Sequence, residues 1–193
     1  MLTITLDQIR AHSPCTEGWR KLLAYLDKNE ADDEPFPLEI VLESNGFDAL
    51  WCLRCFNDLE GPIRLLAVRF AREVEYLMLD ERSRNALDVA ERFAKGTATL
   101  EELKIAADAA YSASIAAAYA ATAHSAAAYD AVADVYYAAA YSAAYGATVA
   151  AAHDVYDAVY DAAAYADRSR QTEIFRDFCR EFSNWSTKND YLC

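Results

Sequence analysis

The alanine-rich tract of this chain begins at Ala106 and reads AADAAYSASIAAAYAATAHSAAAYDAVADVYYAAAYSAAY as far as Tyr145. It continues in the same composition to Ala166, and thirty of these 61 residues are alanine. Alanine has the highest intrinsic helix propensity of all amino acids, and only Gly146 stands in the tract as a helix breaker. The tract therefore predicts α-helix for the second half of the chain.

A single helix over residues 105–167 would be about 95 Å long. A chain of 193 residues is short for such a helix, so we expect two or three helices with turns near His124 and Gly146. Alanine faces let the axes of packed helices approach closely, and tyrosine rings would fill the edges between them.

The rest of the chain also has helical periodicity, with prolines and glycines between the periodic segments. Only residues 2–5 look extended, and Thr5 is better explained as the cap of a helix. Residues 29–37 contain an acidic cluster and two prolines, and they are expected to form a surface loop. Helices are predicted over residues 5–12, 16–26, 38–45, 48–55, 63–79, 83–95 and 171–182.

These segments predict an all-α fold in which an array of short amphipathic helices precedes long alanine-rich helices. The arrangement is expected to be solenoid- or bundle-like. By composition, residues 1–104 form a helical N-terminal region and residues 105–193 form a helical region rich in alanine, tyrosine and aspartate. The two regions are expected to make one continuous domain.

The net charge of −13 is unevenly distributed. Residues 105–167 contain seven aspartates but no glutamate, lysine or arginine. Direct nucleic-acid binding is disfavoured, because neutralising phosphates needs a basic patch. A basic protein surface is the natural complement. The alternative is that the charge only keeps an alanine-rich protein soluble.

Five cysteines in a chain without a recognisable secretory signal favour reduced thiols and a cytoplasmic location in a bacterial host. Aspartates interrupt the alanine-rich tract too often for a membrane span. We therefore expect no membrane association.

Aspartate and tyrosine form two stripes at helical spacing within the tract. Valines fall on the opposite side of each stripe and would face a core. Aspartate is a poorer helix former than glutamate, and like charges one turn apart repel each other. Their repeated use suggests a surface for partner binding, and the alternative is a solvated face. The predicted partner-binding residues are Asp130, Asp134, Tyr137, Tyr141 and Tyr145 in the first stripe, and Asp154, Asp157, Asp161 and Tyr165 in the second.

The segment Trp51-Cys52-Leu53-Arg54-Cys55 is the motif closest to an active site, since thiol redox enzymes use two cysteines at this spacing. No strand is predicted before it, and two cysteines three residues apart on a helix are more often small core residues. A zinc site would need two further ligands, such as His12 and Cys15. We therefore predict no catalytic residue, no metal and no cofactor, and keep a thiol redox protein as an alternative.

Several segments of the first half carry a resemblance to a known family. They are LDQIRAHSPC at residues 6–15, GW at 18–19, KLL at 21–23, ADDEP at 31–35, LESNG at 42–46, ALWCLR at 49–54 and AERFA at 90–94. In these segments the chain resembles a family of small phage and prophage proteins that are labelled as immunity proteins. The resemblance implies an all-helical fold without assigned catalytic residues. Relatives often place tryptophan and arginine in the alanine-rich part, whereas this chain uses tyrosine and aspartate there.

Composition and resemblance together favour a non-enzymatic, acidic, phage-type protein that binds and inhibits a bacterial defence protein. Its acidic surface would compete for a basic nucleic-acid-binding site, as a DNA-mimicking anti-CRISPR protein does. One alternative is an immunity protein that neutralises a toxin through the same surface. The alanine-rich faces and the tyrosines are also compatible with a homodimer.

Overall fold

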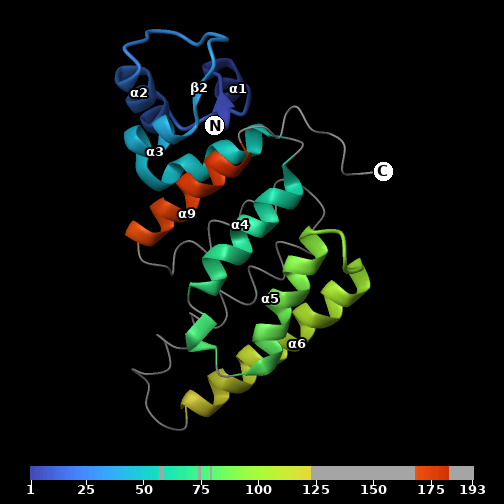
Figure 1. Cartoon of the computed structure of the whole chain (residues 1–193). Helices are drawn as coiled ribbons and strands as arrows, with labels where there is room; N and C mark the ends of the chain where they lie inside the picture. Colours follow the sequence, from blue (N-terminus) through green and yellow to red (C-terminus); the bar gives the residue numbers. More distant parts are fainter. Residues whose placement is uncertain (57–58, 74, 79, 123–167, 183–193) are drawn as a thin grey trace. The chain divides into compact units, whose positions relative to one another are not determined.

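The computed structural model describes residues 1–56, 59–73, 75–78, 80–122 and 168–182 of the chain (Figure 1). Most of these residues are helical, and within them one two-stranded sheet accompanies the helices, so the predicted all-α class is confirmed. The chain divides into two compact units. Unit 1 comprises residues 1–59 and 172–193, and unit 2 comprises residues 60–171.

Unit 1 is built mainly from short helices. In chain order its elements are β1 (Thr3–Ile4), α1 (Leu6–Ala11), α2 (Thr16–Tyr25), β2 (Phe36–Pro37), α3 (Glu39–Asn45), the 3-10 helix η1 (Gly46–Cys55) and the larger part of α9 (Arg168–Glu181). The Thr5 hydroxyl accepts the Gln8 N–H at 3.1 Å, and the Gln8 side chain accepts the Thr5 N–H at 2.9 Å. This reciprocal cap explains why α1 begins where the sequence predicts a helix.

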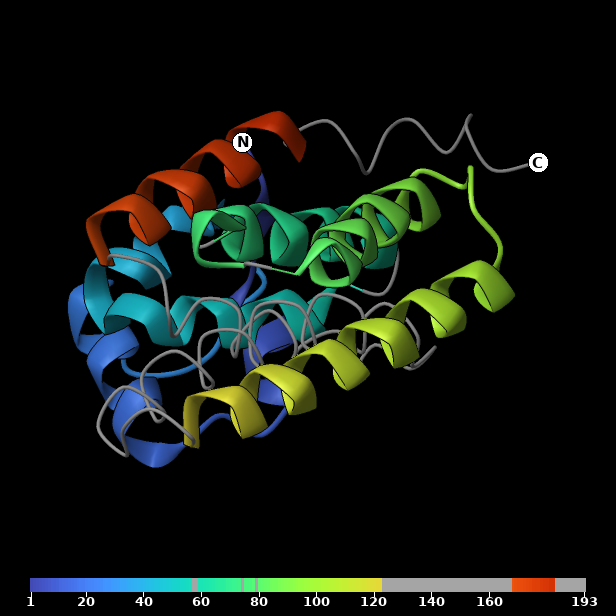
Figure 2. The same cartoon turned by 90° about the horizontal axis from the view of Figure 1, so that it is seen from below.

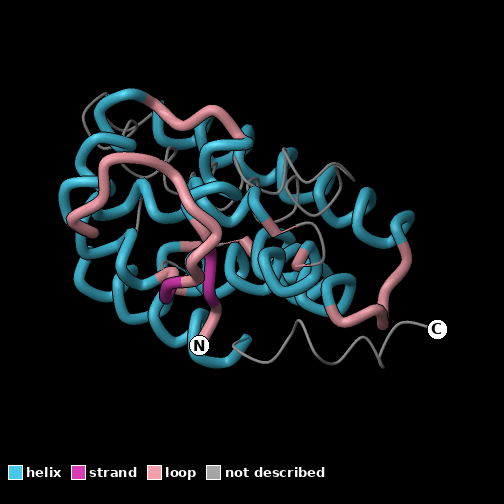
Figure 3. The backbone as a smooth tube through the Cα atoms, turned by 90° about the horizontal axis from the view of Figure 1, so that it is seen from above, coloured by secondary structure: helices cyan, strands magenta, loops and turns pink. Residues whose placement is uncertain are grey.

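The sheet of unit 1 pairs two strands of two residues each (Figure 3). Ile4 lies opposite Phe36 in an antiparallel register. The sequence assigned Phe36 to a surface loop, whereas the structure places it in a strand with only 8% of its surface exposed. Leu2, the residue before β1, anchors the sheet with two backbone hydrogen bonds. Its N–H donates to the Cys179 carbonyl oxygen, and its carbonyl oxygen accepts the Leu38 N–H.

The buried side chains of unit 1 come from almost every one of its elements. Phe175 and Phe178 of α9 are both buried, and their ring centroids lie 6.4 Å apart. The largest fully buried side chains of this unit are Ile4, Leu6, Leu22, Leu38, Leu50, Leu53, Phe175 and Phe178. The sequence predicts that Ile174, Phe175, Phe178 and Phe182 pack from the last helix. The first three are buried core residues, whereas Phe182 is only partly buried.

Unit 2 contains α4 (Glu60–Arg72), the short 3-10 helix η2 (Glu75–Leu77), α5 (Glu81–Ala94) and α6 (Leu100–Thr122). The sequence predicted a break at Pro62, but α4 begins before it. A proline in the first turn costs no helical hydrogen bond, because the N–H groups there have no partner in the helix. The predicted helix over residues 63–79 is shorter than expected at its end, since α4 ends at Arg72.

Helices α5 and α6 lie side by side in unit 2 (Figures 1 and 2). A cluster of buried apolar side chains joins them to α4, and its members are Val68, Ala71, Met78, Ala86, Leu87, Val89, Ala90, Leu103, Ala106 and Ala110. Five of these ten are alanine, which allows the helix backbones to come close together. At the start of α4, a Cβ on Gly61 would lie 3.3 Å from the Ala94 carbonyl oxygen, so a side chain there would press against the end of α5.

Candidate interaction surface

All the predicted partner-binding residues lie outside the described residues. These are Asp130, Asp134, Tyr137, Tyr141, Tyr145, Asp154, Asp157, Asp161 and Tyr165. The described part of the alanine-rich tract is α6, which begins at Leu100 and carries the first alanines, the first aspartate and the first tyrosine of the tract. Helix α6 is therefore the part of the tract whose faces the structure describes.

The beginning of α6 is fixed by a reciprocal cap. The Glu102 N–H donates to the Thr99 hydroxyl at 3.2 Å, and the Glu102 carboxylate accepts the Thr99 N–H at 2.7 Å. The Thr99 hydroxyl also donates to this carboxylate at 3.0 Å. The two bonds that the carboxylate accepts from the Thr99 backbone and hydroxyl lower the pKa of Glu102, and the Arg92 guanidinium adds to the effect. A negative charge at this end is also favoured by the helix dipole.

One face of α6 packs into the core of unit 2. Leu103 is completely buried, and Ala106, Ala110 and Ala113 are 3%, 1% and 1% exposed. Their spacing of three or four residues follows the helical period. The buried face is therefore made almost entirely of alanine from Ala106 onward.

The opposite face of α6 carries the large and charged side chains. Asp108 is exposed, and Ile105 and Tyr111 keep 61% and 42% of their surfaces exposed. The Ser112 hydroxyl donates to the Asp108 carbonyl oxygen at 2.9 Å, so it is satisfied within the helix. This face presents the Asp108 carboxylate between Ile105 and Tyr111, with the exposed Lys104 one turn before Asp108, and aromatic residues of this kind are enriched at protein interfaces.

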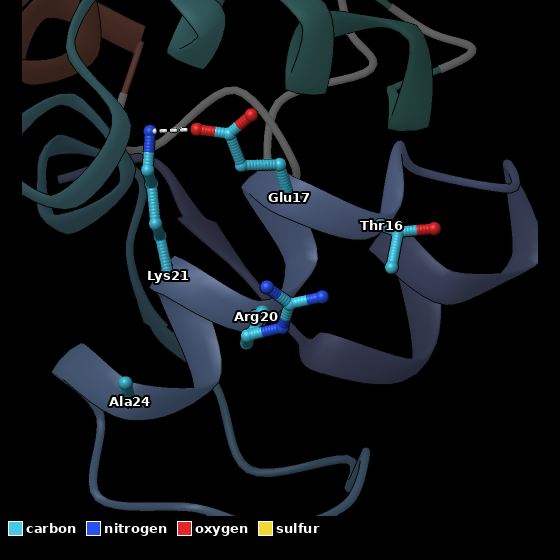
Figure 4. Close-up of a pocket in the computed structure, with 5 residues that line it drawn as sticks. All are labelled: Thr16, Glu17, Arg20, Lys21 and Ala24. Carbon is cyan, nitrogen blue, oxygen red and sulfur yellow. Dashed lines mark ion pairs between the residues drawn. The ribbon is translucent and has the colours of Figure 1, made fainter.

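A second surface feature is an open hollow on α2, with a volume of about 560 Å³. Its lining residues are Thr16, Glu17, Arg20, Lys21 and Ala24 (Figure 4). The Lys21 ammonium lies 2.7 Å from the Glu17 carboxylate, whereas the Arg20 guanidinium is drawn without an ion pair. This hollow was not predicted from the sequence, although Thr16, Arg20 and Ala24 follow one another at a spacing of four residues along one ridge of α2.

The two cysteines of the redox-like motif lie in η1 rather than in an α-helix. Cys52 is 3% exposed. The Cys55 thiol is half-buried, and burial raises its pKa to about 12. It donates to the Gln8 carbonyl oxygen over a long distance of 3.7 Å. A redox cysteine reacts as its thiolate, so this environment gives the thiol redox alternative no support.

Metal-ligating side chains do not gather in the described part of the chain. No group of three histidine, cysteine or acidic residues is arranged there to hold a metal ion. His12 and Cys15 are both exposed, and Cys15 caps α2 by accepting the Gly18 N–H at 3.3 Å. His124 and His153 lie outside the described residues.

Across the described helices, none is long and apolar enough to cross a membrane.

Comparison of the sequence with protein-family models and with curated proteins, and of the fold with solved structures, finds no match.

Proposed function

We propose that this protein is a non-enzymatic inhibitor that binds a basic surface of a bacterial defence protein through the acidic face of its alanine-rich tract. The target would be a nucleic-acid-binding defence complex of the CRISPR type, and the acidic face would occupy the site that nucleic acid uses. The protein would then act as an anti-defence protein of a phage or prophage.

The observation that carries this proposal is the division of α6 into two faces. Ala106, Ala110 and Ala113 are buried, whereas Asp108 and Tyr111 are exposed. The tract thus uses alanine for packing and aspartate with tyrosine for display wherever its side chains are described. The same alternation continues in the sequence through the two aspartate and tyrosine stripes.

The charge of the tract supports a basic partner. From Ile105 to Asp167 there is no lysine or arginine to neutralise the seven aspartates. Acidic surfaces of this kind accelerate encounter with basic partners, and salt screens the attraction. Tyrosine supplies rigid apolar contact area of the sort enriched at binding sites. Binding should accordingly be specific for a basic site and weaker at high ionic strength.

Affinity capture with the tagged protein tests the proposal. Lysates of bacteria that carry defence systems are passed over the protein at low and at high salt, and bound proteins are identified by mass spectrometry. We expect a nucleic-acid-binding defence complex to be recovered at low salt and largely lost at high salt. Recovery that does not depend on salt would contradict binding through the acidic stripes.

A matched pair of charge reversals tests the site. Asp130→Lys with Asp134→Lys should abolish capture and inhibition, because the stripe changes from attractive to repulsive. The control is Glu30→Lys with Asp33→Lys, which makes the same change in net charge at exposed residues of unit 1. Circular dichroism should show unchanged helicity in both. Equal loss in the two variants would mean that only the total charge matters.

The second stripe is tested in the same way. A triple reversal of Asp154, Asp157 and Asp161 to lysine should also abolish binding if the two stripes form one surface. Retained inhibition by both the double and the triple variant would overturn the proposal, whatever the target.

A second candidate function is that of an immunity protein, and it rests on the expected resemblance of segments within residues 5–95 to the phage and prophage family. An immunity protein would neutralise a toxin through the same acidic face. The capture experiment separates the two functions, because it would recover a toxin instead of a nucleic-acid-binding defence complex. Protection of cells that express that toxin would then decide for immunity.

A further inference from the structure

The hollow on α2 differs in charge from the rest of this acidic protein. Glu17 and Lys21 lie one turn apart and neutralise each other through an ion pair of 2.7 Å. No hydrogen bond or ion pair joins Arg20 to another residue in the part of the chain that the structure describes. The hollow therefore has a net charge of about one positive unit, supplied by Arg20.

The neighbours of Arg20 leave room for a ligand group. Thr16 and Ala24 lie one turn before and one turn after Arg20, so the three share one ridge of the helix. All three are exposed. Figure 4 shows the Thr16 hydroxyl oxygen turned away from the Arg20 guanidinium, so the hydroxyl reaches an acceptor beside the guanidinium after rotation about its Cα–Cβ bond. The short Ala24 side chain keeps the other side of the hollow open.

This arrangement favours a carboxylate over other anions. A guanidinium matches the planar carboxylate with two parallel N–H bonds. A phosphate monoester carries nearly two negative charges, and the Glu17 carboxylate on the rim would repel the second of them. The single positive charge of the hollow therefore fits a monoanion best.

We propose that the α2 hollow is a docking site for an acidic protein segment, with an aspartate or glutamate carboxylate bound between Arg20 and Thr16. An open hollow encloses only part of a ligand, so the segment must bring its own surface to cover the remainder. The site is separate from the acidic face of the proposed function, and neither depends on the other. The protein thus recognises one partner surface by acidic residues and a second by a basic one.

Nuclear magnetic resonance titration of the full chain tests the site. The probe is the blocked peptide acetyl-Gly-Glu-Gly-amide, which carries one negative charge, and the signal is the Nε–H cross-peak of Arg20. The comparison probes are acetyl-Gly-Gln-Gly-amide, acetate and inorganic phosphate. We expect the glutamate peptide to shift the Arg20 signal at the lowest concentration and the glutamine peptide to leave it in place.

Three variants identify the residues that bind, and binding to each is followed through the backbone amide signals of α2. Arg20→Gln should weaken binding of the glutamate peptide about tenfold, because it removes a charge-assisted pair. Ala24→Gln should weaken it without a change of charge by filling the hollow. Arg10→Gln removes an equally exposed charge from α1 and should bind as the unchanged protein does. Circular dichroism confirms that each variant is folded.

Several outcomes would overturn the docking site. Equal shifts with the glutamine peptide would show that charge is not recognised, and unreduced binding to Arg20→Gln would show that the wrong residue has been chosen. Stronger binding of phosphate would exclude a carboxylate site. Stronger binding of acetate would exclude a protein segment as the ligand.

Discussion

The guanidinium of Arg72 lies 2.7 Å from the Asp88 carboxylate and so ties the last turn of α4 to the middle of α5. The same guanidinium lies 3.0 Å from the carboxylates of Glu75 and Glu91. One cation therefore serves three carboxylates from two segments, η2 and α5, and Lys95 supplies a second cation to Glu91. Because the Arg72 side chain is only 32% exposed, water screens these bonds less than it screens surface ion pairs.

Replacing Arg72 by methionine should lower the free energy of unfolding by about 1–2 kcal/mol. The hydrogen bonds between its guanidinium and the three carboxylates are lost, while the carboxylates remain and water screens them only in part. Urea unfolding followed by circular dichroism measures the loss. The control is Arg82→Met, because Arg82 pairs with Asp80 only two residues away and does not join two helices. An equal effect of both changes would show that the Arg72 network adds no tertiary stability.

The cap of α6 should make stability depend on pH. Glu102 has a folded-state pKa below its ordinary value of 4.5, because the Thr99 backbone and hydroxyl bind its carboxylate. A lowered carboxylate pKa contributes stability that is present above the unfolded-state pKa and is lost as pH falls through the folded-state pKa. We therefore expect the contribution of this cap to decline as pH falls below about 4.5.

Thr99→Ala tests that cap. The change should lower the free energy of unfolding by about 1 kcal/mol at neutral pH. It should also make the free energy of unfolding fall less steeply as pH is lowered. Urea unfolding at pH 7 and at several values below pH 5 gives both quantities. Thr16→Ala is the comparison, because its hydroxyl makes no hydrogen bond within the described residues. A steeper acid dependence in Thr99→Ala than in the unchanged protein would contradict the assignment.

Local signals were sufficient to predict most helix ends. Thr5 caps α1 through its own hydroxyl. Gly46 and Gly96 follow the ends of α3 and α5 with φ angles of +61° and +71°, which glycine adopts without strain. Each of these features needs only residues within one turn, so the sequence pattern contains the necessary information.

Features that depend on distant residues could not be predicted. β2 forms because Phe36 meets Ile4 across 32 positions of chain, and a two-residue strand has no periodicity of its own. The Arg72 network likewise requires the fold before its members can be identified. The residues that line the α2 hollow all lie on one helix, but their spacing alone does not show that the surface beside them stays open. At the candidate surface, the division of α6 into alanine and aspartate–tyrosine faces agrees with the periodicity rule that was applied to residues 130–145. The arrangement of those residues stays a prediction.

Two buried serines should respond differently to replacement by alanine. The Ser83 hydroxyl is completely buried in α5, and the structure gives it no hydrogen-bond partner. The Ser44 hydroxyl is partly buried and donates to the Val41 carbonyl oxygen at 3.2 Å. Ser83→Ala should therefore leave stability unchanged or raise it by up to about 1 kcal/mol, whereas Ser44→Ala should lower it by a similar amount. Thermal and urea unfolding of the two variants check the difference. Destabilisation by Ser83→Ala would reveal a bond that the hydroxyl makes in solution.

Thiol alkylation separates the structural cysteines from a reactive one. Burial raises the pKa of the Cys55 and Cys179 thiols to about 12, and the Glu39 carboxylate adds to the effect at Cys179. Cys15 is exposed at the beginning of α2. Because only the thiolate reacts, iodoacetamide at pH 8 should modify Cys15 long before Cys55 or Cys179. Peptide mapping by mass spectrometry measures the three rates, and the protein unfolded in urea should show them nearly equal.

If Cys55 reacted as fast as Cys15 in the folded protein, the thiol redox alternative would regain support. The double change Cys52→Ser and Cys55→Ser would then have to abolish activity instead of only loosening the packing of η1.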